Sequence, residues 1–266
     1  LVVDAASEYS RVAESRDDLP DLERVISIKA VEGLQSYGGL LDAEPSAEAV
    51  AEVDARLAAA SGDDLASLIY TSGTTGEPRG VMLRHGGFTH QIDALEVFFD
   101  IEPDDHSLCF LPLSHALERA WTYVVLSHGC MNTYVADAKT VAEQMVLAQP
   151  TLMVSVPRLY EKVFLTAHQK VASSPAKKKI FDWALRVGGQ CQRAYRKGRT
   201  PSPYWRAQLP LADKLVLSSV REAMGGPKTV MACGGAPLRV EIEEFFSAVG
   251  MMLYTGYGLT EASPLV

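Results

Sequence analysis

Residues 71–80 have the composition of a phosphate-binding loop. The segment reads TSGTTGEPRG and follows the apolar run at 67–70. Glycines let backbone N–H groups approach an anion, consecutive N–H groups can form an anion nest, and hydroxyl and guanidinium groups add further donors. No Gly-Lys-Ser/Thr follows, so the segment is not a Walker A loop. The composition favours a polyphosphate site over a plain surface turn. The glycine, hydroxyl and basic members are Thr71, Ser72, Gly73, Thr74, Thr75, Gly76, Arg79 and Gly80.

Two segments near the carboxyl end are suited to the rest of a nucleotide. Residues 233–238 read CGGAPL, where glycines allow a planar base to lie against the backbone and a helix N-terminus adds positive potential. Residues 255–261 read TGYGLTE, which offers an aromatic face for a base and a carboxylate for Mg²⁺. Alone, residues 233–238 favour an ordinary strand-to-helix turn, and residues 255–261 are equally compatible with one. Their order behind the loop at 71–80 favours one nucleotide site.

The run YTSGTTGEPRGV at 70–81 resembles the phosphate loop of the adenylate-forming superfamily, which includes acyl-CoA synthetases, peptide-synthetase adenylation domains and luciferases. The family usually has Lys where this chain has Arg79, and Ser where it has Cys233. The resemblance implies that residues 71–76 and Arg79 hold the β and γ phosphates. It also implies that residues 234–237 flank adenine.

The same resemblance assigns roles to the segment at 255–261. Tyr257 is expected to stack on adenine, Thr260 to contact the α-phosphate and Glu261 to ligate Mg²⁺. The implied ATP site contains Thr71, Ser72, Gly73, Thr74, Thr75, Gly76, Arg79, Gly234, Gly235, Ala236, Pro237, Tyr257, Gly258 and Thr260.

Residues 111–121 read LPLSHALERAW and resemble the family segment in which a His lies beside the substrate carboxylate and an aromatic residue gates the acyl tunnel. The implied acyl pocket contains His115, Trp121 and Gly256, and the implied catalytic residues are Thr260, Glu261 and His115. A carboxylate with a pKa of about 4 is already ionised at neutral pH, so His115 is expected to position it. Two alternatives stay open: a hydrogen-bonded structural His115, and Trp121 as core packing.

Residues 154–162, VSVPRLYEK, resemble the long-chain fatty acid branch of the family, in which a helical insertion follows. The matching insertion here is at about 165–210, and its part at 165–206 has 10 basic residues and one acidic residue. A basic amphipathic element suggests contact with an anionic membrane. A solvated charged face packed on the core is the alternative. The pattern predicts a break at Gly188 and Gly189, after an apolar stripe of Ile180, Trp183, Ala184 and Val187.

Short apolar runs alternate with helical patterns along the chain, which predicts an α/β fold of mostly parallel sheets flanked by helices. Helices are expected at 46–60 and 237–249. The resemblance narrows this to part of the acyl-CoA synthetase-like N-terminal domain. In such sheets ligands bind where strands end. The expected strands are 1–3, 67–71, 107–111, 131–135, 151–156, 229–233 and 251–255.

Composition narrows the function classes. The 266 residues carry a net charge of −8, which argues against nucleic acid as a partner. The four cysteines have no CxxC spacing, so zinc is not indicated, and buried thiols in a reducing cytosol are expected. We therefore expect a cytoplasmic protein, with the inner face of a membrane as its contact if the basic insertion binds one. No apolar run reaches the length of a membrane span.

The resemblance implies a long-chain fatty acid–CoA ligase, an acid–thiol ligase that uses fatty acid, ATP, CoA and Mg²⁺. The sequence begins at Leu1 and is expected to be residues 1–266 of a longer chain: a partial AMP-binding N-terminal domain without the C-terminal lid domain, and inactive alone. Three alternatives stay open: a ligase for another acid or for a carrier-protein acceptor, a non-catalytic nucleotide-binding relative, and an interaction fragment without ligand.

Overall fold

The computed structural model describes residues 1–72 and 77–266. The chain divides into two compact units, Leu1–Ala60 and Ser61–Val266. Each unit contains a parallel sheet and helices. The predicted fold class is confirmed: this is an α/β protein with mostly parallel sheets flanked by helices.

The first unit, Leu1–Ala60, holds a three-stranded parallel sheet of order β1-β2-β3. Its longest helix, α3, begins after Ser46, whose Oγ accepts a hydrogen bond from the Ala49 N–H at 3.2 Å. The predicted helix at 46–60 is thereby confirmed. The elements are β1 (Val2–Val3), α1 (Ala6–Glu14), η1 (Arg16–Asp18), β2 (Ile26–Ser27), β3 (Gln35–Ser36), α2 (Tyr37–Leu41) and α3 (Ala47–Ala59).

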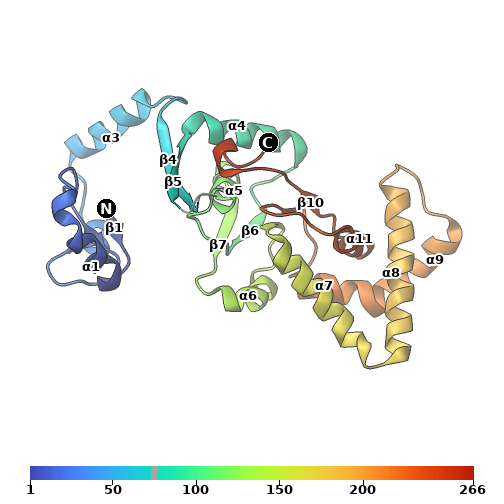
Figure 1. Cartoon of the computed structure of the whole chain (residues 1–266). Coiled ribbons are helices and arrows are strands. Elements are labelled where there is room, and N and C mark those ends of the chain that lie inside the picture. Colours follow the sequence, from blue (N-terminus) through green and yellow to red (C-terminus); the bar gives the residue numbers. More distant parts are fainter. Residues whose placement is uncertain (73–76) are drawn as a thin grey trace. The chain divides into compact units, whose positions relative to one another are not determined.

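The second unit, Ser61–Val266, is built on a five-stranded parallel sheet (Figure 1). The strand order is β10-β9-β8-β6-β7, so chain order and spatial order differ and helices connect the strands. The strands are β6 (His106–Cys109), β7 (Met131–Tyr134), β8 (Leu152–Ser155), β9 (Val230–Cys233) and β10 (Tyr254–Thr255).

The helices of this unit cover both faces of the sheet, which explains the continuously apolar strands. Met153 and Met231 pack in one core cluster with side chains of α7, α8 and α11. Leu152 and Val154 point to the other face, where α4 and α5 pack. The helices are α4 (His85–Phe98), α5 (Ala116–Ser127), η2 (Ala138–Thr140), α6 (Val141–Ala148), α7 (Pro157–Ala172), α8 (Pro175–Tyr195), α9 (Pro203–Ala212), η3 (Asp213–Leu217), α10 (Ser218–Ala223), α11 (Val240–Ala248) and η4 (Thr260–Ala262).

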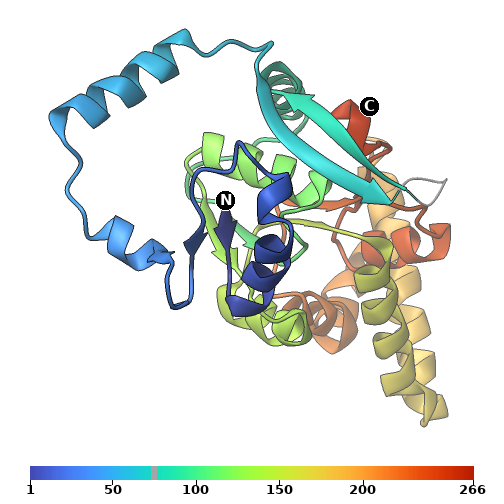
Figure 2. The same cartoon turned by 60° about the vertical axis from the view of Figure 1, so that its left-hand side comes forward.

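The strand that leads into the phosphate-loop segment lies outside the parallel sheet. β4 (Leu65–Ser72) pairs antiparallel with β5 (Pro78–Arg84), and together they form the two-stranded ribbon visible in Figure 2. The expectation that the loop follows a strand of a parallel sheet is therefore wrong. The connection is too short for the crossover that parallel pairing requires, and Pro78 and Gly80 hid β5 from the apolar pattern.

The basic segment forms helices α7, α8 and α9 rather than one broken helix. The predicted break at Gly188 and Gly189 is wrong, because α8 runs through both residues. A Cβ on Gly188 would lie 2.0 Å from the Ala248 carbonyl oxygen, so glycine here permits close packing of α8 on α11. Phe181, Ala184 and Val187 are buried, whereas the predicted stripe member Ile180 is 45% exposed. No described helix is long and apolar enough to cross a membrane.

The boundaries of other predicted elements shift by a few residues. The helix predicted to begin at Pro237 begins at Val240, because residues 234–239 form the turn that follows β9. The strand predicted at 251–255 is reduced to Tyr254–Thr255, with Met251 and Leu253 buried ahead of it. All four cysteines are free and buried, as predicted.

Candidate functional site

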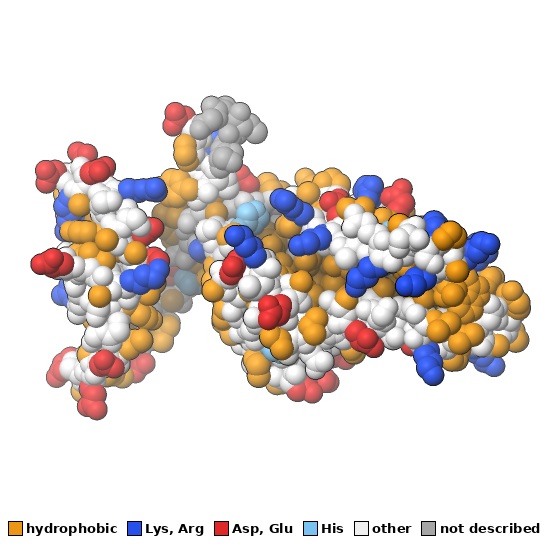
Figure 3. All heavy atoms as spheres, turned by 90° about the horizontal axis from the view of Figure 1, so that it is seen from below, with side chains coloured by type: hydrophobic (Ala, Val, Ile, Leu, Met, Phe, Trp, Pro, Cys, Tyr) orange, Lys and Arg blue, Asp and Glu red, His pale blue; other side chains and the backbone are white. Residues whose placement is uncertain are grey.

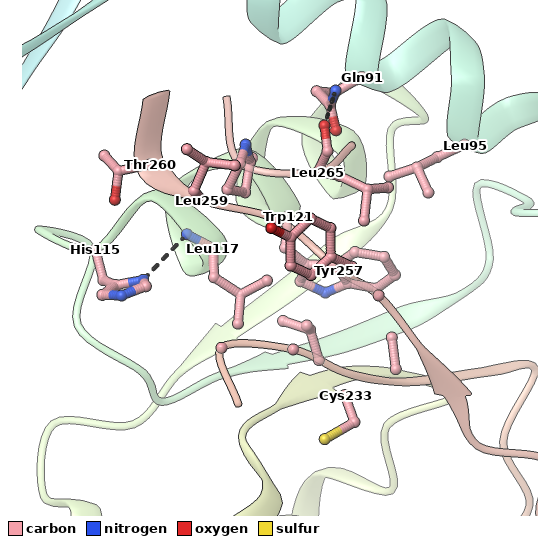
Figure 4. Close-up of a pocket in the computed structure, with 18 of the residues that line it drawn as sticks. Gln91, Leu95, His115, Leu117, Trp121, Cys233, Tyr257, Leu259, Thr260 and Leu265 are labelled. Carbon is pink, nitrogen blue, oxygen red and sulfur yellow. Dashed lines mark hydrogen bonds between the residues drawn. The ribbon is translucent and has the colours of Figure 1, made fainter. Parts of the chain in front are cut away.

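A cavity of about 390 Å³ lies where strands β6, β8, β9 and β10 end. This is the edge at which α/β sheets hold ligands. The structure brings segments from six separate parts of the second unit to this one cavity (Figure 4). The predicted site residues that line it are Thr71, His115, Trp121, Gly234, Gly235, Gly256, Tyr257, Gly258, Thr260 and Glu261.

Some predicted residues lie elsewhere. Gly73, Thr74, Thr75 and Gly76 are outside the described residues, and Ser72 is described only as the last residue of β4. Arg79 is exposed on β5 and does not line the cavity, although it is the register partner of Thr71, which does. Ala236 and Pro237 are exposed in the turn beyond Gly235 and do not line it either.

The wall made by residues 233–235 depends on glycine. Gly235 has a φ of +82°, a left-handed backbone conformation that residues other than glycine adopt only at an energetic cost. Gly234 is buried, and the Cys233 that precedes it is buried too. Burial raises the pKa of the Cys233 thiol to about 12, and nearby Glu161 adds to the shift. The thiol therefore stays protonated and serves as packing, not as a nucleophile.

The segment 256–265 folds back over the cavity. Gly256 donates a backbone hydrogen bond to Cys233 at 2.9 Å, and Gly258 pairs with Leu265 in an antiparallel bridge. A Cβ on Gly258 would lie 1.7 Å from the Pro264 carbonyl oxygen, so only glycine permits this return of the chain. The return leaves the Tyr257 ring 76% exposed and available to a planar ligand.

His115 caps helix α5. Its Nδ1 accepts a hydrogen bond from the Leu117 N–H at 3.3 Å, so the ring proton of the neutral form is on Nε2. The side chain is exposed and lines the cavity, and in Figure 4 it lies on the same side as Thr260. The predicted alternative of a hydrogen-bonded His is thus met in part, while the Nε2–H remains available to a ligand.

One end of the cavity is apolar. Leu95 and Phe99 reach it from α4 and the residue that follows, Val154 from β8, and Trp121 from α5. The Trp121 indole is 5% exposed, and its Nε1–H donates to Ser107 Oγ at 3.1 Å, which fixes the ring. Trp121 therefore packs in the core, as one alternative predicts, and it also lines the cavity, while its role as a gate stays a prediction.

Sequence reasoning missed the contribution of α4. Gln91 lines the cavity and donates from Nε2 to the Leu265 carbonyl at 3.0 Å, which ties the returning segment to this helix (Figure 4). Leu95 lies one turn further along the helix, and Phe99 is the residue that follows it. No motif surrounds these three residues, and spacings of four residues suggest only an amphipathic helix. Their role arises from the packing of α4 beside the sheet.

The donors fit a cation that is shared with a bound polyphosphate. Glu261 is exposed at the cavity, and Thr260 precedes it. Within residues 1–72 and 77–266, no group of three His, Cys, Asp or Glu residues could enclose a metal ion. Mg²⁺ commonly takes one or two carboxylates and completes its shell with phosphate oxygens and water. One exposed carboxylate at this cavity therefore suits a Mg²⁺ ion that arrives with a polyphosphate ligand.

A family model described as "AMP-binding enzyme" matches residues 1–266. The chain belongs to this family. It is 35% identical over 265 residues to the long-chain-fatty-acid–CoA ligase FadD15 of Mycobacterium bovis, a match that covers 99% of this chain and 44% of the relative. It is 34% identical over 207 residues to the peroxisomal long chain acyl-CoA synthetase 7 of Arabidopsis thaliana, which covers 77% of this chain and 28% of that protein. The chain thus spans less than half the length of these two relatives.

Solved structures share the fold of this chain. The A-PCP didomain of carboxylic acid reductase from Segniliparus rugosus, in complex with AMP, aligns over 98% of this chain and 36% of its own. Its TM-score is 0.61 at 24% identity. ATP-bound MatB from Rhodopseudomonas palustris aligns with a TM-score of 0.60 at 19% identity, over 99% of this chain and 40% of its own. These likenesses show that this chain has the same fold as those structures.

Proposed function

We propose that this chain is part of a ligase that activates a long-chain fatty acid with ATP and transfers the acyl group to CoA. The observation that carries the proposal is a single cavity with two unlike ends. At one end lie His115 and Thr260, and at the other lie Leu95 and Trp121 (Figure 4). Glu261 and Phe99 also line the cavity. A fatty acid has the same division between a polar head and an apolar tail. The relatives named long-chain-fatty-acid–CoA ligases support the choice of acid and acceptor.

The reaction has two steps. The acid's carboxylate attacks the α-phosphorus of ATP, and the bond to pyrophosphate breaks. The CoA thiolate then attacks the acyl carbon of the acyl-adenylate, and AMP leaves with the bonding electron pair. Neither step needs a covalent intermediate with the protein, so the side chains bind, orient and neutralise charge.

Each site residue has a proposed role in the first step. Tyr257 and the backbone at 234–235 hold the adenine, and Thr260 donates to the α-phosphate. His115 donates its Nε2–H to the acid's carboxylate and directs it toward phosphorus. Mg²⁺ bound at Glu261 supplies charge neutralisation for the phosphate oxygens. Residues 71–76 and Arg79 bind the β and γ phosphates in this proposal.

The division of the chain is also a proposal. Residues 1–266 are part of the family's large N-terminal domain, α7 to α9 include its insertion at about 165–210, and the lid domain belongs to other parts of the full-length protein. The relatives' greater length supports this. Residues 1–266 alone are expected to be inactive. Pyrophosphate release measured for this fragment and for the full-length protein under the same conditions checks the expectation.

The acceptor has a second candidate. A chloroplastic long-chain-fatty-acid–[acyl-carrier-protein] ligase of Arabidopsis thaliana is 30% identical and aligns with the whole of this chain. The first step is the same for both acceptors. The two are separated by supplying either CoA or phosphopantetheinylated carrier protein to the full-length protein and measuring which one is acylated.

Pyrophosphate release tests the function directly. The full-length protein receives Mg-ATP and acids from acetate to palmitate, with and without CoA. We expect release that rises with chain length and acyl-CoA as the product. If no acid gives pyrophosphate release although ATP binds measurably, the proposal is contradicted. That result would favour a non-catalytic nucleotide-binding relative, for which Arg79 in place of Lys gives the reason.

We further propose that the cytoplasmic face of an anionic membrane is where the protein meets its insoluble acid. Lys177, Lys178 and Lys179 are exposed at the start of α8, and Ile180 beside them is half exposed. Figure 3 shows Lys and Arg side chains, with hydrophobic ones between them, over the end that α8 and α9 form. Vesicles of phosphatidylserine should bind the protein, and changing the three lysines to Glu should release it. Binding that survives this change would contradict the idea.

A further inference from the structure

The segment at 110–115 joins strand β6 to helix α5 and ends at His115. The His115 N–H donates to the Pro112 carbonyl at 2.9 Å, and the His115 ring caps α5. These contacts are local and fix the shape of the turn. The position of the turn relative to the sheet depends on two other side chains, Glu118 and Arg119, which reach back to it from the first turn of α5.

Glu118 holds the beginning of the segment. Its side chain is fully buried, and its Oε2 accepts a hydrogen bond from the Leu111 N–H at 3.2 Å. Its Oε1 has no hydrogen-bond partner among the residues that the structure describes. A buried carboxyl is costly, and burial raises the pKa of Glu118 to about 7. An apolar side chain would pack here at less cost, so the stability of the core does not explain a glutamate at this position.

Arg119 holds the segment further along. Its Nε donates to the Leu113 carbonyl at 2.9 Å, and a second guanidinium nitrogen donates to Ser67 Oγ on β4. Four residues beyond Ser67, Thr71 lines the cavity, and the phosphate-loop segment begins there. Two adjacent residues therefore fasten the segment on both sides of Pro112, and one of them also fastens β4.

We propose that Glu118 and Arg119 are positioning residues that set where His115 meets the acid substrate. The inference rests on the proposed function, because His115 acts on an acid only if one binds beside it. Glu118 acts on the segment at 110–115 alone. Arg119 also acts on β4, so its influence extends to the phosphate side of the cavity.

Among the described residues, the titratable side chain that contacts Glu118 is the Cys109 thiol of β6. Burial raises the pKa of that thiol to about 12, with the Glu118 carboxyl contributing. The thiol therefore keeps its proton at neutral pH, and Glu118 is the member of the pair that titrates there.

The first test compares two variants of Glu118 in the full-length protein. Glu118→Gln keeps an oxygen that accepts from Leu111, whereas Glu118→Met keeps the volume and loses the acceptor. We expect Glu118→Met to raise the KM for the acid by about ten-fold and Glu118→Gln to change it by less than about two-fold. The KM for ATP should stay the same in both. Glu143→Met, in the exposed first turn of α6, is the matched control and should change neither value.

The split between the two substrates distinguishes positioning from general damage. A wild-type KM for the acid in Glu118→Met would overturn the proposal. So would an equal rise in the KM for ATP and the acid, because that pattern indicates a loss of fold and not a displaced His115.

A second readout does not require activity. Amide hydrogen exchange of the peptide spanning 110–116 should be about ten-fold faster in Glu118→Met than in the wild type, and unchanged in Glu118→Gln. If the wild type releases no pyrophosphate with any acid, the proposed function fails, but the exchange rates still show whether Glu118 holds the segment at 110–115. Unchanged exchange in Glu118→Met would show that Glu118 does not hold it.

Arg119→Met tests the other contact. Because Arg119 is bonded to both the segment and Ser67, the variant should raise the KM for the acid and the KM for ATP together while the unfolding temperature stays the same. The same rise with a lowered unfolding temperature would indicate a loss of fold and overturn this role. Arg119→Lys can form only one of the two hydrogen bonds. It should therefore reverse only part of the rise in one of the two KM values. If only the KM for the acid rises, the hydrogen bond from Arg119 to Ser67 on β4 does not contribute to ATP binding, and that part of the proposal is wrong.

Discussion

The two edges of the five-stranded sheet differ in what their polar groups bind. At the edge where strands begin, Asp105 Oδ1 accepts from Thr151 Oγ1 at 2.5 Å and from Thr229 Oγ1 at 3.1 Å, and Oδ2 accepts from the Glu102 N–H at 3.0 Å. These bonds join the residues that precede β6, β8 and β9. At the edge where strands end, polar groups instead surround a cavity. One edge is satisfied internally and supports stability, whereas the other keeps its donors for a ligand.

The largest expected effect is a loss of activity when a polar residue at the cavity edge is changed. Glu261→Gln removes the carboxylate proposed to bind Mg²⁺, so pyrophosphate release should fall by about 100-fold or more, while the unfolding temperature stays the same. Glu241→Gln, an exposed change in the first turn of α11, is the control and should retain full release. Release above a tenth of the wild-type rate (about 1.4 kcal/mol of barrier) would count against the role of Glu261.

At the edge where the strands begin, a substitution should lower stability and leave activity unchanged. Asp105→Ala leaves the Thr151 and Thr229 hydroxyls without their acceptor, and the free energy of unfolding should fall by about 2–4 kcal/mol. Activity per folded molecule should not change, because the residue lies at the far edge from the cavity. Denaturant unfolding measures the loss. A stable but inactive Asp105→Ala would show that the two edges are not separate.

The aromatic face at the cavity gives a smaller effect. Tyr257→Ala should raise the KM for ATP by about ten-fold, since stacking on a base contributes about 1–3 kcal/mol. Tyr257→Phe keeps the ring and should behave as the wild type. The ring is 76% exposed, so neither change should alter stability. Equal affinity for ATP in all three proteins would remove Tyr257 from the adenine site.

The smallest effect is a pH dependence of stability that comes from Glu118. Its pKa rises from 4.5 to about 7 on folding, chiefly through burial. Below pH 4.5 the carboxyl is protonated in both states, and above pH 7 it is ionised in both, so the unfolding free energy falls as pH rises between these values. The loss is about 3 kcal/mol in total. Glu118→Gln should abolish this slope in urea titrations, and an unaltered slope would contradict the assignment.

Much of the fold could be predicted because the five-stranded sheet is covered on both faces. Strands such as Leu152–Ser155 are buried throughout and therefore stand out as short apolar runs. The antiparallel partner β5 could not be found this way, because only Leu83 of its seven residues is buried. The continuity of α8 through Gly188 also had no local signal, since it depends on packing against Ala248.

The cavity could be predicted where its residues lie in turns after strands. The glycines at 234, 256 and 258, and the Thr260 and Glu261 that follow, gained their meaning from their order behind the loop at 71–80. Leu95 and Phe99 could not be predicted, because their role depends on where α4 packs. Glu118 was visible in the segment at 111–121, but its burial and its bond to Leu111 are known only from the structure.

The central claim is that one cavity binds both the nucleotide and the acid's tail. The most direct measurement is pyrophosphate release by the full-length wild type and by Leu95→Trp, with acids from acetate to palmitate. The larger ring should fill the apolar end, so release with palmitate should fall by about ten-fold or more while the optimum moves to shorter acids and the KM for ATP stays the same. An unchanged chain-length profile in Leu95→Trp would contradict the claim.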